Sequence, residues 1–183
     1  MKIIIMNRRK LLVEELNRVS LDEFREVEKI PLTVVLDNVR SQHNIGSVFR
    51  TSDAFLVEEI ILCGITATPP NADIHKTALG SEDSVKWSYH EDTLDVVAQL
   101  KDKGYLVYSI EQTENSIMLD KIELDKNKKY AVVLGHEVHG VQQAVVDASL
   151  NCIEIPQFGT KHSLNVSVAG GIVIWDFFKM LNK

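Results

Sequence analysis

The stretch Tyr130-Ala131-Val132-Val133-Leu134-Gly135 is typical of a buried strand in a parallel sheet, because an unbroken apolar run ends there at a glycine. Further short apolar runs, typical of strands, recur at residues 33–36, 59–62, 85–87, 105–108 and 152–155. Helical patterns cover about 8–29, 44–55 and 93–103, and a long apolar helix follows Ser163 as its N-cap. This alternation predicts an α/β fold with a mainly parallel sheet and helices on both faces.

Length and composition favour one globular domain. The chain has 183 residues, of which 45% are apolar and 25% charged, so it can bury a substantial core. We expect residues 1–31 to form a helical extension and residues 32–183 to form the single domain. Cys63 and Cys152 show no metal-ligand or redox spacing, and we see no secretory segment, so we expect reduced thiols in a cytoplasmic protein. The apolar stretch 164–178 is interrupted by polar residues, which favours a buried helix over a membrane span.

The charge is unevenly distributed. A net charge of −6 argues against a protein that coats nucleic acid without specificity. However, residues 91–126 alone hold 9 acidic and 4 basic residues, so a basic patch can exist elsewhere. The triplet Arg8-Arg9-Lys10 is compatible with such a patch and equally with a solvated helix face.

Parallel sheets bind ligands at the carboxyl ends of their strands, which directs attention to segments 37–50, 135–141 and 156–165. In the first, Arg40 and Arg50 bracket the start of a helix, where backbone N–H groups favour anions. Asn44 lies six residues before Arg50, close to two helical turns, so both are expected to point toward the same end of the sheet. The alternative is a capped helix with solvated arginines.

The second segment, Gly135-His136-Glu137-Val138-His139-Gly140, is a loop bounded by glycines, which suit a backbone that approaches a flat ligand. Its two histidines and glutamate suggest a metal site. A zincin helix would need its second histidine at position 140, however, so we expect no metal.

In the third segment, Ile155-Pro156 is followed by the run Ser163-Leu164-Asn165-Val166-Ser167. Capping alone could explain Ser163. Asn165 is expected one turn inside the apolar helix, where a buried amide needs hydrogen-bond partners.

Together the three segments resemble the SpoU-type (TrmH-like) branch of the SPOUT RNA methyltransferases. The first family motif, an Asn followed six residues later by Arg-Thr, is matched by Asn44 and Arg50-Thr51. The second, Leu-Gly-x-Glu-x-x-Gly, is matched by residues 134–140, with His136 where the family most often has Asn or Ala. The third, Ile-Pro and then Ser-Leu-Asn-Val-Ser, is matched within residues 155–167. Residues 76–82 also resemble one subgroup, and the resemblance covers about 33–181.

The resemblance implies a deep trefoil knot over about 130–183 that holds S-adenosylmethionine, with S-adenosylhomocysteine as product. It also implies a homodimer packed through the knot, in which Arg50 of one subunit approaches the cofactor of the other. The residues expected to bind the cofactor are Ile110, Glu111, Leu134, Gly135, His136, Gly140, Ile155, Gln157, Ser163 and Leu164.

The implied activity is methyl transfer to a ribose 2′-hydroxyl of RNA, with tRNA preferred over rRNA. Arg50 is expected to grip a phosphate and stabilise negative charge, since a guanidinium stays protonated and is a poor base. Glu137 is expected either to accept the hydroxyl proton or to orient Asn44 and Arg50, whereas Ser163 and Asn165 would supply hydrogen bonds. The expected RNA contacts are Arg8, Arg9, Lys10, Arg40, Arg50, Lys76 and Lys161.

Three rival functions stay open. One is an inactive knotted protein that only binds RNA, and a second is a base methyltransferase of another SPOUT branch. The third is a metal-dependent hydrolase built on His136, Glu137 and His139.

Overall fold

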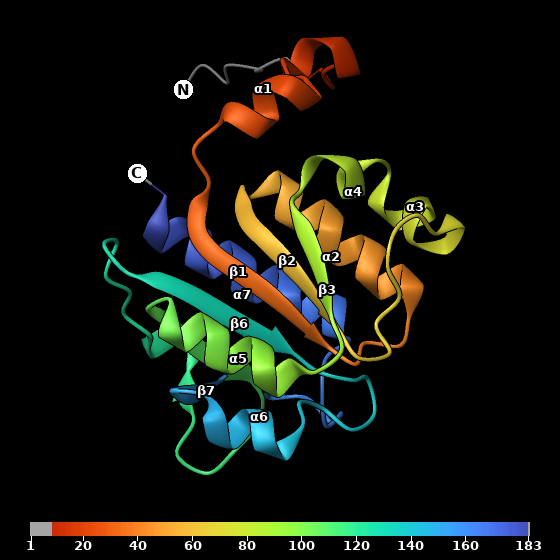
Figure 1. The fold of residues 1–183 in the computed structure, drawn as a ribbon. Coiled ribbons are helices and arrows are strands. Elements are labelled where there is room, and N and C mark those ends of the chain that lie inside the picture. Colours follow the sequence, from red (N-terminus) through yellow and green to blue (C-terminus); the bar gives the residue numbers. More distant parts are fainter. Residues whose placement is uncertain (1–8, 183) are drawn as a thin grey trace, which may run out of the picture.

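A seven-stranded sheet runs through the structure, a computed structural model that describes residues 9–182 (Figure 1). Its strand order is β3-β2-β1-β6-β4-β7-β5, and each neighbouring pair is parallel. The strands are β1 (Ile30–Asp37), β2 (Val57–Cys63), β3 (Trp87–His90), β4 (Tyr105–Ile110), β5 (Ile117–Met118), β6 (Lys129–Leu134) and β7 (Asn151–Glu154). The expected parallel α/β fold is therefore confirmed.

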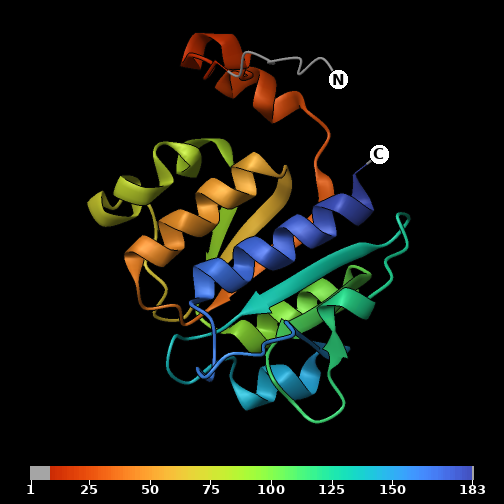
Figure 2. The same ribbon diagram turned by 180° about the vertical axis from the view of Figure 1, so that it is seen from behind.

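Helices cover both faces of this sheet, as expected. One face carries α2 and α7, and the other carries α5 and α6 (Figures 1 and 2). The helices are α1 (Leu21–Glu26), α2 (Gln42–Ala54), α3 (Ala72–Ala78), α4 (Ser81–Ser84), α5 (Thr93–Asp102), α6 (Gln143–Ala148) and α7 (Val166–Leu181). Two 3-10 turns lie at Val13–Leu16 and Leu119–Lys121.

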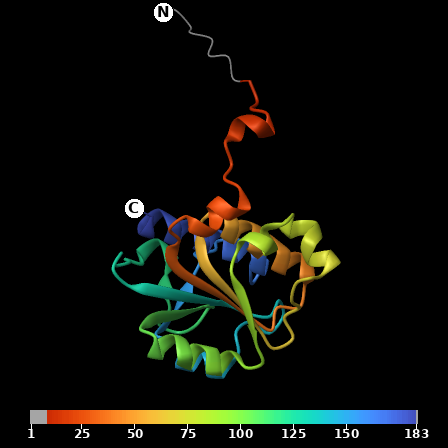
Figure 3. The ribbon, with the colours of Figure 1, turned by 45° about the horizontal axis from the view of Figure 1, so that its top comes forward.

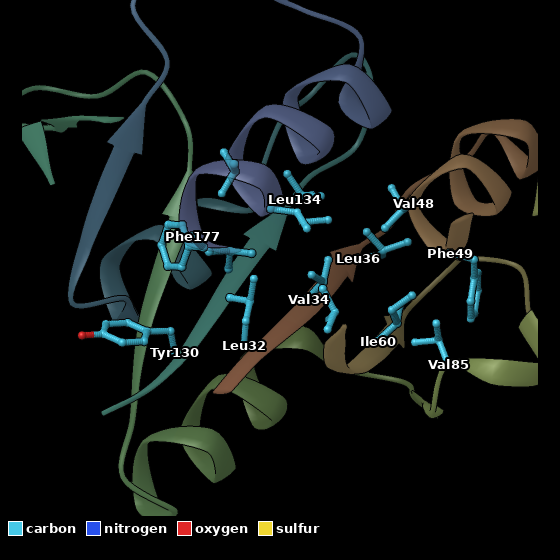
Figure 4. Close-up of a cluster of buried hydrophobic side chains, with 14 of the residues drawn as sticks. Leu32, Val34, Leu36, Val48, Phe49, Ile60, Val85, Tyr130, Leu134 and Phe177 are labelled. Atoms are coloured by element: carbon cyan, nitrogen blue, oxygen red, sulfur yellow. The ribbon is translucent and has the colours of Figure 1, made fainter. Parts of the chain in front are cut away.

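The alternation of side chains along the central strands produces two cores. Val34 and Leu36 join the core beneath α2 and α7, where Phe49 and Phe177 pack (Figure 4). Val35 points to the opposite face, toward α5. Because both faces are buried, these strands are apolar at nearly every position, which is why they were recognisable in the sequence.

The N-terminal helical region expected over about 8–29 is interrupted in the structure. Within the described residues, a 3-10 turn ends at Asn17, which has a φ of 47°, and a separate helix α1 begins after Ser20. Ser20 and Glu23 form a capping box, with the Ser20 backbone N–H donating to the Glu23 carboxylate over 2.8 Å. α1 docks on the core through buried Phe24, whereas the preceding turn extends away from the sheet (Figure 3).

Two further boundaries also differ from expectation. The strand expected at 85–87 lies at Trp87–His90, because Val85 caps α4 and is buried in the core instead. The last helix begins at Val166, and its N-cap is Asn165 rather than Ser163.

The remaining expectations about the chain concern its cysteines and its longest apolar helix. Cys63 and Cys152 are free and buried, and burial raises the pKa of the Cys63 thiol to about 12. Among residues 9–182, no helix combines the length and the hydropathy that crossing a bilayer requires.

Candidate functional site

A cavity of about 480 Å³ lies at the carboxyl ends of β4, β6 and β7, next to the start of α7. Its position follows from the strand order. β6 lies between β1 and β4, so that loops distant in the sequence meet at one edge of the sheet. The lining is Ile110, Glu111, Gln112, Leu134, Gly135, His136, Glu137, Val138, His139, Gly140, Ile153, Glu154, Ile155, Gln157, Ser163, Leu164, Asn165, Val166 and Ala169.

The structure brings all ten residues expected to bind the cofactor into this one lining. Of the residues expected to be catalytic, Glu137, Ser163 and Asn165 also line it, whereas Asn44 and Arg50 do not. Sequence reasoning missed lining residues such as Gln112 and Ala169. Gln112 lies two residues beyond the end of β4 at Ile110, so a longer segment taken at this strand end would have included it.

The loop after β6 is bridged by hydrogen bonds within its own backbone. His136 and Gly140 exchange two backbone hydrogen bonds, of 3.0 and 2.8 Å. A Cβ on Gly135 would lie 2.2 Å from the carbonyl carbon of Gly140 and from the nitrogen of Val141. At Gly135 the missing side chain therefore allows a close approach within the loop's own backbone. The contact of this loop with a flat ligand stays a prediction.

Glu111 supports the same loop from β4. Its carboxylate accepts a hydrogen bond from the Val141 backbone N–H over 3.0 Å. Gly140 has a φ of +68°, and a Cβ there would lie 2.2 Å from a Glu111 carboxylate oxygen. Glu111 thus lines the cavity and also holds the loop that closes it.

Asp37 is a second support that sequence reasoning missed. This carboxylate, at the end of β1, is fully buried. It accepts hydrogen bonds from the Gln142 backbone N–H over 2.9 Å, the Gln142 side chain over 2.8 Å and the Thr93 hydroxyl over 2.6 Å. A buried carboxylate is tolerated only with such partners, and here they tie the loop after Gly140 to the central strand.

Glu137 is bound to the start of α2. Its carboxylate accepts hydrogen bonds from the backbone N–H groups of Arg40 and Ser41, over 3.0 and 2.9 Å, and from the Asn44 side chain over 2.9 Å. Burial raises the pKa of Glu137, but these hydrogen bonds outweigh it and lower the pKa to about 2. Glu137 is therefore ionised at neutral pH and is a weak base, and both of its carboxylate oxygens accept hydrogen bonds.

Asn44 connects this carboxylate to α7. Its side-chain oxygen accepts a hydrogen bond from the Asn165 amide over 3.1 Å and a longer one, 3.4 Å, from the Ser167 hydroxyl. Asn165 is exposed and caps α7, accepting from the Ser167 backbone N–H over 2.9 Å. The expectation of a buried amide one turn inside the helix is thus wrong, although the need for partners holds.

Arg50 points away from Asn44. Six residues of α-helix separate them by about 9 Å along the axis and turn the side chains by roughly 240°. Arg50 is exposed and has no ion-pair partner among residues 9–182. Contrary to our expectation, the two side chains do not point the same way, and the single chain does not bring Arg50 into the cavity.

The other residues expected to contact RNA are scattered. Arg9 pairs with Glu15 over 2.7 Å and Lys76 with Asp73 over 2.6 Å. Lys10, Arg40 and Lys161 are exposed. Arg8 lies outside the described residues.

The geometry of the second loop disfavours the metal-dependent hydrolase. The Glu137 oxygens are occupied by α2, and the His136 Nδ1 accepts from the Val138 backbone N–H over 3.0 Å. The rings of His136 and His139 pack against each other with centroids 4.8 Å apart. Among residues 9–182, no group of three or more His, Cys, Asp or Glu side chains is arranged to hold a metal ion.

The sequence model of the SpoU rRNA Methylase family matches residues 31–175, a span that includes all three motif segments. The chain belongs to this family. A curated SpoU relative, the tRNA (guanosine(18)-2′-O)-methyltransferase of Thermus thermophilus, is 33% identical over 165 residues, covering 88% of this chain and 81% of the relative.

Solved structures of SpoU proteins share the fold. A TrmH/SpoU tRNA modifying enzyme of A. aeolicus superimposes with a TM-score of 0.77 at 27% identity, covering 92% of this chain and 84% of that one. An AdoMet-bound rRNA methyltransferase of Sinorhizobium meliloti has a TM-score of 0.77 at 26% identity, covering 87% of this chain but 61% of that one. The SPOUT fold class is thereby confirmed.

Proposed function

We propose that this chain transfers a methyl group from S-adenosylmethionine to a ribose 2′-hydroxyl of RNA, with tRNA as the preferred substrate. The observation that carries the proposal is that the second and third motif segments line one cavity, while Asn44 of the first contacts both Glu137 and Asn165 at its edge. Segments so distant in the sequence meet only through the fold.

The cavity suits this cofactor in size and chemistry. At about 480 Å³ it lies in the range of small-molecule sites. Leu134, Ile155 and Leu164 offer apolar surface to an adenine ring, and the backbone groups of the loops offer hydrogen bonds to polar atoms. When bound, S-adenosylmethionine would supply an electrophilic methyl group on its sulfonium sulfur; its transfer to the ribose oxygen would leave S-adenosylhomocysteine and release the hydroxyl proton to solvent.

Glu137 acts in this proposal as a positioning residue. With its pKa lowered to about 2 and its oxygens engaged by α2, it is a poor proton acceptor. It fixes the Asn44 amide so that the oxygen faces Asn165 and Ser167. These polar groups at the edge of the cavity would orient the ribose hydroxyl, and orientation supplies much of the rate in a displacement reaction.

A homodimer completes the site in this proposal. Val168, Ile172 and Trp175 lie at helical spacing on one face of α7 and are 50%, 37% and 47% exposed. A second copy packed on this stripe would cover it. Trp175 packs on Phe55 at the end of α2, with centroids 5.2 Å apart, so a partner there would also adjoin the helix that carries Arg50. Arg50 would then bind an RNA phosphate next to the partner's cavity.

The preference for tRNA is supported by the 33% identical relative, which is named for tRNA, and by the tRNA modifying enzyme with the same fold. The alternative substrate is rRNA, because the Sinorhizobium enzyme is named for it.

The test is to incubate the protein with methyl-labelled S-adenosylmethionine and RNA from cells that lack it, separated into tRNA and rRNA fractions. We expect label in the tRNA fraction only. Label confined to rRNA would overturn the preference, and no label in either fraction would contradict the proposed activity.

A further inference from the structure

We propose that Phe158 stacks on an unpaired base of the substrate RNA at the mouth of the cavity; this inference rests on the proposed function. The starting observation is that its phenyl ring is 97% exposed, more than any other exposed large apolar side chain among the described residues. Phenylalanine ordinarily buries its ring, because that transfer from water is strongly favourable. A ring exposed to this extent is available for contact with a partner.

Phe158 is placed next to the site. It lies in the loop between β7 and α7, directly after Gln157 and five residues before Ser163, both of which line the cavity. The adjacent Gly159 is exposed, and a Cβ there would meet nothing within 4 Å. Phe158 is therefore exposed to solvent in a loop whose residues on both sides line the cavity.

The loop is anchored on its C-terminal side, so the ring is presented by a supported segment. The Gln112 side chain donates to the His162 carbonyl over 2.8 Å. Asn165 is tied to Asn44 over 3.1 Å. A supported aromatic loses little conformational freedom when a partner binds, which favours its use in recognition.

The surroundings favour RNA over a protein partner. Lys161 and His162 are exposed in the same loop, and no acidic residue occurs between Ile155 and Trp175 in the sequence. Phe158 is flanked by Gln157, Gly159 and polar residues, so it lacks the continuous apolar surroundings of an interface core. Single-stranded RNA is recognised by stacking splayed bases on aromatic rings beside basic groups.

The test compares F158A, F158L and F158Y with the wild-type protein. Leucine keeps apolar bulk without a π-face, and tyrosine keeps the ring. The matched control is L150A, which removes a 57% exposed apolar side chain outside the cavity lining. For each variant, we would measure the Kd for total tRNA from cells lacking the protein by filter binding. The KM for tRNA in methylation, cofactor binding by calorimetry and mass by light scattering would complete the comparison.

We expect F158A and F158L to raise the Kd and KM for tRNA by about 5- to 150-fold, the range of one base stack. F158Y and L150A should stay near wild type, and cofactor binding and mass should not change. Equal Kd values for F158A and wild type would overturn the proposal. So would a change in mass in F158A, which would assign Phe158 to a contact between protein chains. A wild-type protein that binds tRNA but methylates nothing would contradict the proposed function instead, and the Kd comparison would still decide the stacking.

Discussion

At the level of single residues, Glu137 ties stability to pH. Its folded-state pKa is about 2, below the ordinary 4.5, so its ionised form stabilises the fold. That contribution is fully present above pH 4.5 and is lost as the pH falls toward 2. We predict that E137Q lowers the free energy of unfolding near pH 6 by on the order of 3 kcal/mol, and that this difference shrinks steadily below pH 4.5.

Urea unfolding of both proteins across pH 2.5–6.5 measures this difference. E114Q serves as a control, because Glu114 is exposed and makes no side-chain hydrogen bond in the described part of the chain. A gap between E137Q and wild type that stays constant across this pH range would contradict the assigned hydrogen bonds.

The sequence identified which residues belong to the site better than it identified their conformations. The sequence predicts a functional segment at 163–167 with Ser163 as the N-cap of the helix, whereas the structure has Asn165 at the N-cap. Both residues cap helices well, so local propensity does not choose between them. The choice depends on the bond from Asn165 to Asn44, 121 positions away in the sequence. Asp37 was missed for the same reason, because its partners Thr93 and Gln142 come from distant segments.

At the level of elements, the loop after β6 depends on the missing side chain of Gly135. We predict that G135A costs about 1–3 kcal/mol of stability, because a Cβ would lie 2.2 Å from backbone atoms that cannot yield. It should also weaken S-adenosylmethionine binding, since the loop lines the cavity. G159A is the matched control, because a Cβ at Gly159 meets nothing within 4 Å. Thermal unfolding and calorimetry would measure both effects, and equal behaviour of the two variants would refute this account of the loop.

The strands that the sequence predicts most clearly are buried on both faces, whereas the elements that it does not predict are short. β1, β2, β4 and β6 are central strands buried on both faces, so their sequences are continuous apolar runs. β5, at the edge of the sheet, and the helices α3, α4 and α6 are between two and seven residues long, and such short segments carry little periodicity. The helical region predicted over about 8–29 follows its composition, whereas the interruption at Asn17 depends on a left-handed backbone conformation that composition does not show.

At the level of the whole molecule, the stripe on α7 predicts the oligomeric state. I172E places a charge in the centre of this stripe and should convert a dimer into a monomer, because a buried unpaired charge is costly. L94E is the control, since Leu94 is 39% exposed, against 37% for Ile172, but lies on α5 across the sheet. Light scattering measures the mass. A monomeric wild-type protein, or a dimeric I172E, would contradict the proposed interface.

The contribution of Arg50 in trans can be tested by combining two variants that are each expected to have lower activity. R50A keeps an intact cavity, and G135A keeps an intact Arg50. If Arg50 serves the partner's cavity, co-expressed R50A and G135A subunits form heterodimers with one complete site, and methylation should return to about half per heterodimer. No recovery in purified heterodimers would place Arg50 in the site of its own chain.

The structure shows where some of the acidic residues behind the net charge of −6 lie. The acidic segment 91–126 contributes Asp95 and Asp102 to α5, on the face opposite α2 and α7, whereas Glu111 of the same segment lines the cavity. Charge counts in the sequence could not show where these side chains lie, because their positions depend on the fold. The division of the chain at residue 32 stays a prediction.

The most direct test of the central claim is the chemical position of the transferred methyl group. Unmodified tRNA is incubated with the protein and S-adenosylmethionine that carries a deuterated methyl group, and the RNA is then digested to nucleosides and analysed by mass spectrometry. The account predicts deuterated 2′-O-methylnucleosides, identified by label that stays with the ribose fragment. Label on the base fragment, or no label in tRNA that the protein binds, would contradict it.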